Sequence, residues 1–201
     1  MQFIHQLLES LFFFDMPLRG VEKGVYQPPL IALSYIVASF ASYVALSMAQ
    51  CLVSATGATE KRLFHWVGAF SMGAGIWSMH FIGMLSYKMR MVVEYDPWLT
   101  LLSLLIAIAV AYGVLGIVAR DRLPFRRLLI GAVLLGFGIC AMHYTGMAAM
   151  KMDGDLRYMP DIFALSVFIA IAASGTALWI AFKLARSGQS IPSCFRRERR
   201  L

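Results

Sequence analysis

Residues 131–150 read GAVLLGFGICAMHYTGMAAM, and residues 68–87 read GAFSMGAGIWSMHFIGMLSY. The two stretches repeat each other after a shift of 63 residues, which places Met79-His80 on Met142-His143. A weaker copy begins near Leu33 at a slightly different offset. Self-similarity at a fixed period indicates a repeated structural unit. Here the unit is an odd-numbered helix, a basic loop and an even-numbered helix that ends in a Met-His motif.

The composition indicates a membrane protein. Hydrophobic residues make up 60% of the 201 residues and charged residues 14%, whereas soluble domains carry roughly 25% charged residues. In lipid only helices and closed barrels satisfy their own backbone, and a spanning helix needs about 20 apolar residues. We therefore predict an all-α, polytopic bundle of five transmembrane helices. They run over Leu30–Val53, Leu63–Ser86, Trp98–Ala119, Leu128–Met150 and Asp161–Phe182.

The basic residues predict the orientation. Of the 18 lysines and arginines, 12 fall on one side of the predicted spans, in two loops and the carboxyl-terminal tail. Lysine and arginine are retained in the cytoplasm, so the amino terminus is expected outside and the carboxyl terminus inside. The net charge of +7 lies in short loops and forms no stripe with interleaved aromatics, which argues against nucleic acid as a partner.

Three regions follow from this pattern. Residues 1–29 form a periplasmic or interfacial segment, with an amphipathic helix expected over residues 1–14. Residues 30–184 form the helical membrane domain, and residues 185–201 form a basic cytoplasmic tail. A third Met-His pair would fall near position 206, beyond the last residue, and the abrupt change to a polar tail favours a truncated or frameshifted form of a longer repeat.

The two Met-His motifs are the candidate site. Each histidine and the methionine four residues later share one helix face, and by the predicted orientation both faces lie at the outer membrane surface. Imidazole nitrogen with thioether sulfur suits copper, because thioethers select Cu(I) over hard cations. The predicted metal ligands are His80, His143, Met79, Met84, Met142 and Met147, with Tyr144 and Met150 as possible accessory residues.

Other interpretations stay open. Methionine is a common filler in helix packing, so the same residues fit a structural or partner-binding bundle with no metal site. His80 and His143 on two helices could also ligate one haem iron axially. The chain has no phosphate-cradling loop, nucleophile elbow or zinc-protease pattern, so we do not expect an enzyme.

These motifs also carry a resemblance to a known family. Met142-His143-Tyr144-Thr145 spells the motif after which the bacterial MHYT domain is named, and Met79-His80-Phe81-Ile82 resembles a divergent copy. The resemblance covers residues 28–184. It implies an integral membrane sensor domain of paired helices with three motifs, of which this chain carries two.

The resemblance also implies a function. Members of the MHYT family are described as binding copper through the motif residues and as sensing O2, CO, NO or redox state, often beside cytoplasmic GGDEF, EAL or kinase domains. We therefore expect a multi-pass sensory protein of the bacterial inner membrane. Its expected partners are the lipid bilayer and either a second copy of the chain or a cytoplasmic signalling protein.

Overall fold

The structure is a computed structural model that describes residues 24–89, 92–119, 124–152 and 158–186. The amphipathic helix predicted over residues 1–14 and nearly all of the predicted basic tail lie outside these described residues.

The five predicted helices are confirmed as helices, each within a few residues of its predicted bounds except at the start of the second. They are α2 (Pro28–Ser54), α3 (Ala58–Leu85), α4 (Pro97–Val118), α5 (Phe125–Ala148) and α6 (Pro160–Arg186). The described residues also form four two-residue strands in the segments before and between these helices: β1 (Val25–Tyr26), β2 (Tyr87–Lys88), β3 (Glu94–Tyr95) and β4 (Met150–Lys151). The described part of the chain is therefore all-helical apart from these short strands.

Four of the helices are long and apolar enough to cross a membrane, namely α2, α4, α5 and α6. The remaining helix, α3, is long enough but less apolar. It begins with the charged run Glu60-Lys61-Arg62 and also carries His65 and His80. The prediction of a membrane bundle is thus supported by four helices, and the fifth crossing stays a prediction.

Proline sets where several helices begin. Pro28, Pro97 and Pro160 stand at the first turn of α2, α4 and α6, where the missing N–H costs nothing and the fixed φ angle suits a helix. Asp96 caps α4, because its side chain accepts hydrogen bonds from the backbone N–H groups of Trp98 and Leu99. These residues fix the ends of the helices near the candidate site.

The sequence repeat is also a repeat of helix packing. A β-carbon added to Gly73 of α3 would stand 2.6 Å from the Cα of Ile108 in α4, and one added to Gly136 of α5 would stand 2.7 Å from the Cα of Ile171 in α6. Glycine and other small residues let membrane helices approach this closely. Helices α3 and α5 therefore each pack on the next helix through equivalent residues.

The short strands repeat in the same way. Strand β1 pairs with β2 in the register Val25 opposite Lys88, and β3 pairs with β4 in the register Glu94 opposite Lys151. The first pair ties the segment before α2 to the segment after α3. The second pair ties the segment before α4 to the segment after α5. These ties hold the neighbouring ends of the helices in a fixed relation around the candidate site.

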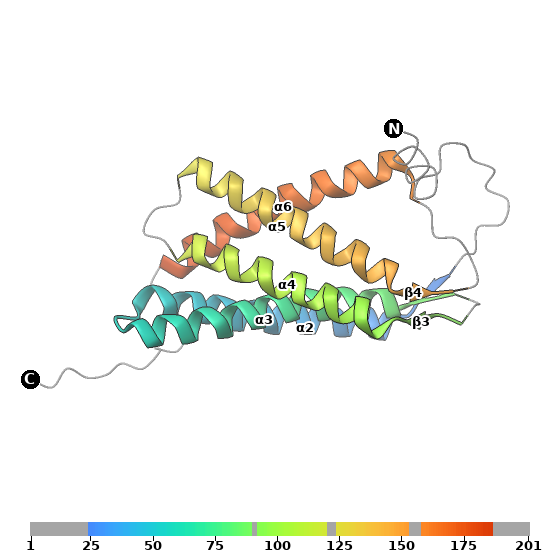
Figure 1. The fold of residues 1–201 in the computed structure, drawn as a ribbon, viewed down its shortest axis with the longest axis horizontal. Coiled ribbons are helices and arrows are strands. Elements are labelled where there is room, and N and C mark those ends of the chain that lie inside the picture. The colour runs from blue at the N-terminus through green and yellow to red at the C-terminus, as the bar shows by residue number, and fades with distance from the viewer. Residues whose placement is uncertain (1–23, 90–91, 120–123, 153–157, 187–201) are drawn as a thin grey trace, which may run out of the picture.

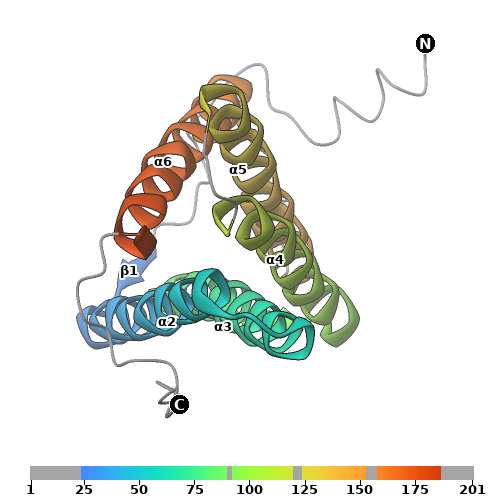
Figure 2. The same ribbon diagram turned by 90° about the vertical axis from the view of Figure 1, so that its left-hand side faces the viewer.

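Figure 1 shows the helices running along the long axis of the molecule, with β3 and β4 at one end. In the end-on view of Figure 2 they form three sides of a triangle: α2 with α3, α4 with α5, and α6 alone. The helix pairs in most extensive contact are α2 with α3, then α5 with α6 and α3 with α4.

Candidate metal site

The two motif histidines meet. His80 comes from the last two turns of α3 and His143 from the last two turns of α5, and their rings form a hydrogen bond between Nε2 of His80 and Nδ1 of His143. The ring centroids are 4.5 Å apart and the planes are inclined by 89°. Helices α3 and α5 have few other contacts, so the histidine pair is a principal link between the two motifs.

The contact fixes complementary protonation of the facing nitrogens. One of them must carry the proton and the other the lone pair, because a neutral imidazole has one donor and one acceptor nitrogen. A metal ion held by both nitrogens would replace this hydrogen bond and move the rings apart. The pair therefore offers two nitrogen ligands from two helices at one place.

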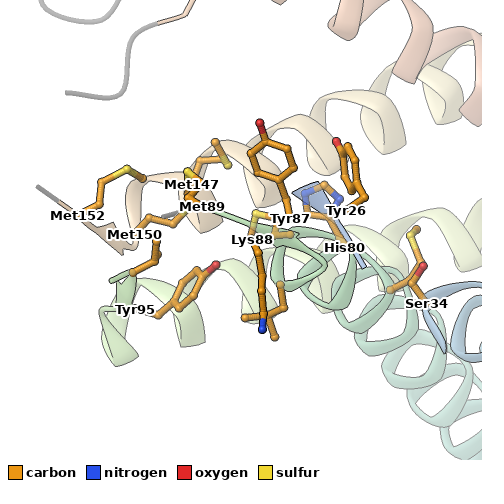
Figure 3. Close-up of a pocket in the computed structure, with 15 residues that line it drawn as sticks. Tyr26, Ser34, His80, Tyr87, Lys88, Met89, Tyr95, Met147, Met150 and Met152 are labelled. Carbon is orange, nitrogen blue, oxygen red and sulfur yellow. The ribbon is translucent and has the colours of Figure 1, made fainter. Parts of the chain in front are cut away.

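Most of the predicted methionine ligands border one cavity with His80. The cavity has a volume of about 820 Å³, and the predicted residues Met79, Met84, Met147 and Met150 line it. Figure 3 shows His80, Met147 and Met150 around this space. Thioether and imidazole groups thus share one cavity, as their helical spacing predicts.

Met142 lies elsewhere. Its side chain is 1% exposed and borders a separate small gap with Ile76 of α3 and Val110 of α4. The structure therefore places Met142 in the packing between three helices and not beside the other predicted ligands.

Tyr144 also points away from the cavity. Its hydroxyl lies 2.9 Å from the hydroxyl of Ser166 in α6, and its ring packs on Phe163 at a centroid distance of 4.8 Å. In the first motif the equivalent ring, Phe81, packs on Tyr95 at 5.3 Å. The aromatic residue at the third motif position therefore packs each of α3 and α5 against the segment that follows it.

Several cavity residues were missed by the sequence analysis. Met89 and Met152 line the cavity, as do Tyr26, Tyr87 and Tyr95. A signal for the two methionines was present, because Lys88-Met89 and Lys151-Met152 are related by the same shift of 63 residues. The aromatic residues lie in or beside the short strands, which no periodic pattern marks.

The charged groups near the cavity are few. Lys88 is its charged lining residue, and no carboxylate of the described residues lines it. Asp96, at the start of α4, pairs with Lys151 at 2.9 Å, and the hydrogen bond from Lys151 holds the pKa of that carboxyl below its usual range. Burial raises the pKa of Tyr95, so this ring stays neutral.

The donor chemistry fits copper better than a hard or purely histidine-bound metal. The described residues hold no group of three or more histidine, cysteine, aspartate or glutamate side chains that could bind a metal ion. The available donors are two imidazoles and several thioethers, the combination that suits copper.

The family model described as the bacterial signalling protein N-terminal repeat, MHYT, matches residues 73–131 and 136–191. No solved structure matches the chain.

Three relatives are signalling proteins. The bifunctional diguanylate cyclase/cyclic di-GMP phosphodiesterase MucR of Pseudomonas aeruginosa is 48% identical over 83% of this chain and 24% of its own length. The cyclic di-GMP phosphodiesterase NbdA of the same organism is 43% identical over 83% of this chain and 21% of its length. The signaling protein YkoW of Bacillus subtilis is 39% identical over 80% of this chain and 20% of its length.

The chain thus spans about a fifth to a quarter of the length of these relatives. The catalytic activities in their names are those of the whole proteins, whereas the shared part is the repeat that carries the two motifs. The two family matches fall on the two repeats seen in the sequence and in the helix packing. The chain belongs to the MHYT family of bacterial signalling proteins.

Proposed function

We propose that this chain is a membrane sensory module that binds copper between its two motifs and reports the state of that site to a cyclic di-GMP signalling output. The observation that carries the proposal is the contact between His80 and His143 beside a cavity lined by methionines. Two nitrogens and nearby thioether sulfurs form a donor set that suits copper.

His80 and His143 would hold the ion, with Met84 and Met147 as sulfur donors, since each methionine lies four residues after its histidine and lines the cavity. Bound copper would supply a centre that changes oxidation state or takes O2, CO or NO. The residues of the chain orient the donors, because two separate helices bring the imidazoles together. A change of ligand or oxidation state at the site would therefore alter the position of α3 relative to α5.

A sensory role requires a membrane topology that places the site on one side and the output on the other. We propose that α3 crosses the membrane with the four more apolar helices, since it packs between α2 and α4 along its length. The positive loops then lie in the cytoplasm of the bacterial inner membrane, and the histidine pair lies near the outer surface. A signal from outside would reach a cytoplasmic domain or partner through the helices.

Haem is the less suitable cofactor. A porphyrin held by two axial histidines lies between their rings, whereas these two rings are in direct hydrogen-bond contact. A wide apolar slot would have to open between α3 and α5.

Metal content and visible absorption of detergent-purified protein test the proposal. The wild type loaded with copper and then desalted is expected to retain copper that the His80→Ala, His143→Ala double variant loses. His65→Ala is the matched control, because His65 lies toward the other end of α3 and bonds to the backbone oxygen of Tyr112 at 2.8 Å. Equal copper in all three folded proteins, or an intense Soret band in the wild type, would overturn it.

A further inference from the structure

A second set of methionines lies beyond the helix ends. Met89 follows β2, Met150 lies in β4 and Met152 follows β4, and all three line the same cavity as His80. Each side chain is half-buried. In Figure 3 the labelled Met150 and Met152 gather with Met89 on one side of the cavity, and His80 lies on the other side.

We propose that Met89, Met150 and Met152 form a second metal site, in which a soft monovalent ion such as Cu(I) is held by thioethers alone. None of the three belongs to the histidine pair or its hydrogen bond. Their site would exist whether or not the imidazoles bind copper.

Their position is unusual for packing methionines. A methionine used as a filler is enclosed by other side chains, as Met142 is at 1% exposure. Met89 and Met152 instead stand outside the helices, in the segments that connect them, where they are half-buried and line the cavity. They are also equivalent positions of the two repeats, so each repeat contributes one sulfur from the same place.

The surroundings select the ion by softness and charge. No carboxylate of the described residues lines the cavity, and Lys88 is among its lining residues. Hard divalent cations such as Ca²⁺ and Mg²⁺ need oxygen ligands, usually with compensating negative charge, and the described lining residues supply no such charge. Neutral thioethers bind Cu(I) without any such charge.

The location gives the site a role in delivery. The three sulfurs lie past the ends of α3 and α5, whereas His80 and His143 lie inside these helices. An ion that enters the cavity from the loop side meets the thioethers before it meets the imidazoles. Met147, which also lines the cavity, offers a further sulfur inside the helix end.

The two sites can be separated by substitution. His80 and His143 supply the imidazoles of one site, whereas Met89, Met150 and Met152 supply the thioethers of the other. Either set of side chains can therefore be replaced while the other set is kept.

The experiment counts Cu(I) bound to the detergent-purified full chain at neutral pH under ascorbate, against a chromogenic Cu(I) chelator. The test variant carries Met89→Leu, Met150→Leu and Met152→Leu, since leucine conserves volume. The control variant carries Met48→Leu, Met72→Leu and Met159→Leu, which removes three thioethers that do not line the cavity. Circular dichroism checks that each protein is folded. Any ion bound by cysteine thiols is bound by every variant alike, so it does not affect the difference in bound copper between variants.

We expect the test variant to bind one ion fewer than the wild type and the control. Unchanged binding in the test variant would overturn the second site. Loss of one ion in the His80→Ala, His143→Ala variant alone would then leave the histidine site standing. Loss in the methionine variant without loss in the histidine variant would support the second site and contradict the proposed function.

Discussion

His80 and His143 occupy equivalent positions of the two repeats, yet they meet through different nitrogens, Nε2 of His80 and Nδ1 of His143. The symmetry that relates the helices therefore does not relate the two rings. Each ring still brings one nitrogen to the contact, so each is expected to contribute to a shared metal site.

The single variants His80→Ala and His143→Ala should therefore weaken copper binding to a similar degree. We expect each to raise the dissociation constant by at least about 10-fold, the lower end of the usual effect of disturbing a metal site. Competition with a chelator of known affinity measures this change. His65→Ala is the control. Loss in one single variant and not in the other would show that only one ring is a ligand.

Tyr144→Phe should leave copper binding unchanged and reduce stability. The hydroxyl of Tyr144 bonds to Ser166 of α6 and not to the cavity, and an intramolecular hydrogen bond contributes about 0.5–1.5 kcal/mol. Thermal unfolding in detergent measures the loss. Combined with Ser166→Ala, the variant completes a double-mutant cycle in which the two losses should not add. A drop in copper binding on Tyr144→Phe would instead identify the tyrosine as an accessory ligand.

Gly136→Ala should destabilise the bundle. The new β-carbon would meet the backbone of Ile171 at 2.7 Å, so α5 and α6 would have to separate, and overpacking of this kind typically costs about 1–3 kcal/mol. Gly83→Ala is the control, because no heavy atom lies within 4 Å of its added β-carbon. A lower melting temperature for Gly136→Ala alone is expected. Equal melting temperatures would contradict the close packing of α5 on α6.

The pair between Asp96 and Lys151 should make stability depend on pH. The hydrogen bond from Lys151 lowers the pKa of Asp96 in the folded protein, so the stabilisation is present above the unfolded pKa and is lost as pH falls through the folded pKa. Asp96→Asn should therefore lower the melting temperature near neutral pH and have a smaller effect at about pH 3, below the usual aspartate pKa. Glu60→Gln controls for the loss of one carboxylate. A difference that does not shrink in acid would contradict this assignment.

The helices could be predicted because long apolar runs mark them directly. The largest error was at the start of α3, which begins at Ala58 rather than Leu63. Hydropathy does not register the run Glu60-Lys61-Arg62, although these residues form helices readily. The strands β1 to β4 were not predicted, because two residues are too few to show a period and their pairing joins distant segments.

The site could be predicted only in part. The spacing of four residues correctly placed Met84 beside His80 on one helix face. The repeat suggested that Met79 and Met142 would have the same surroundings, but Met142 packs against Ile76 of α3. Among the described residues no helix precedes α2, so α3 has no counterpart to the neighbour that α3 itself gives to α5. Met79 therefore lacks such a neighbour and lines the cavity. Tertiary packing thus separates two positions that the sequence presents as equivalent.

The most direct measurement of the central claim is X-ray absorption at the copper edge of the folded chain loaded with one equivalent of copper. The account predicts a first shell that contains both imidazole nitrogen and thioether sulfur, and loss of the imidazole signal in the His80→Ala, His143→Ala variant. A first shell without imidazole in the wild type, or one unchanged in the variant, would contradict the claim that the two motifs share a copper site.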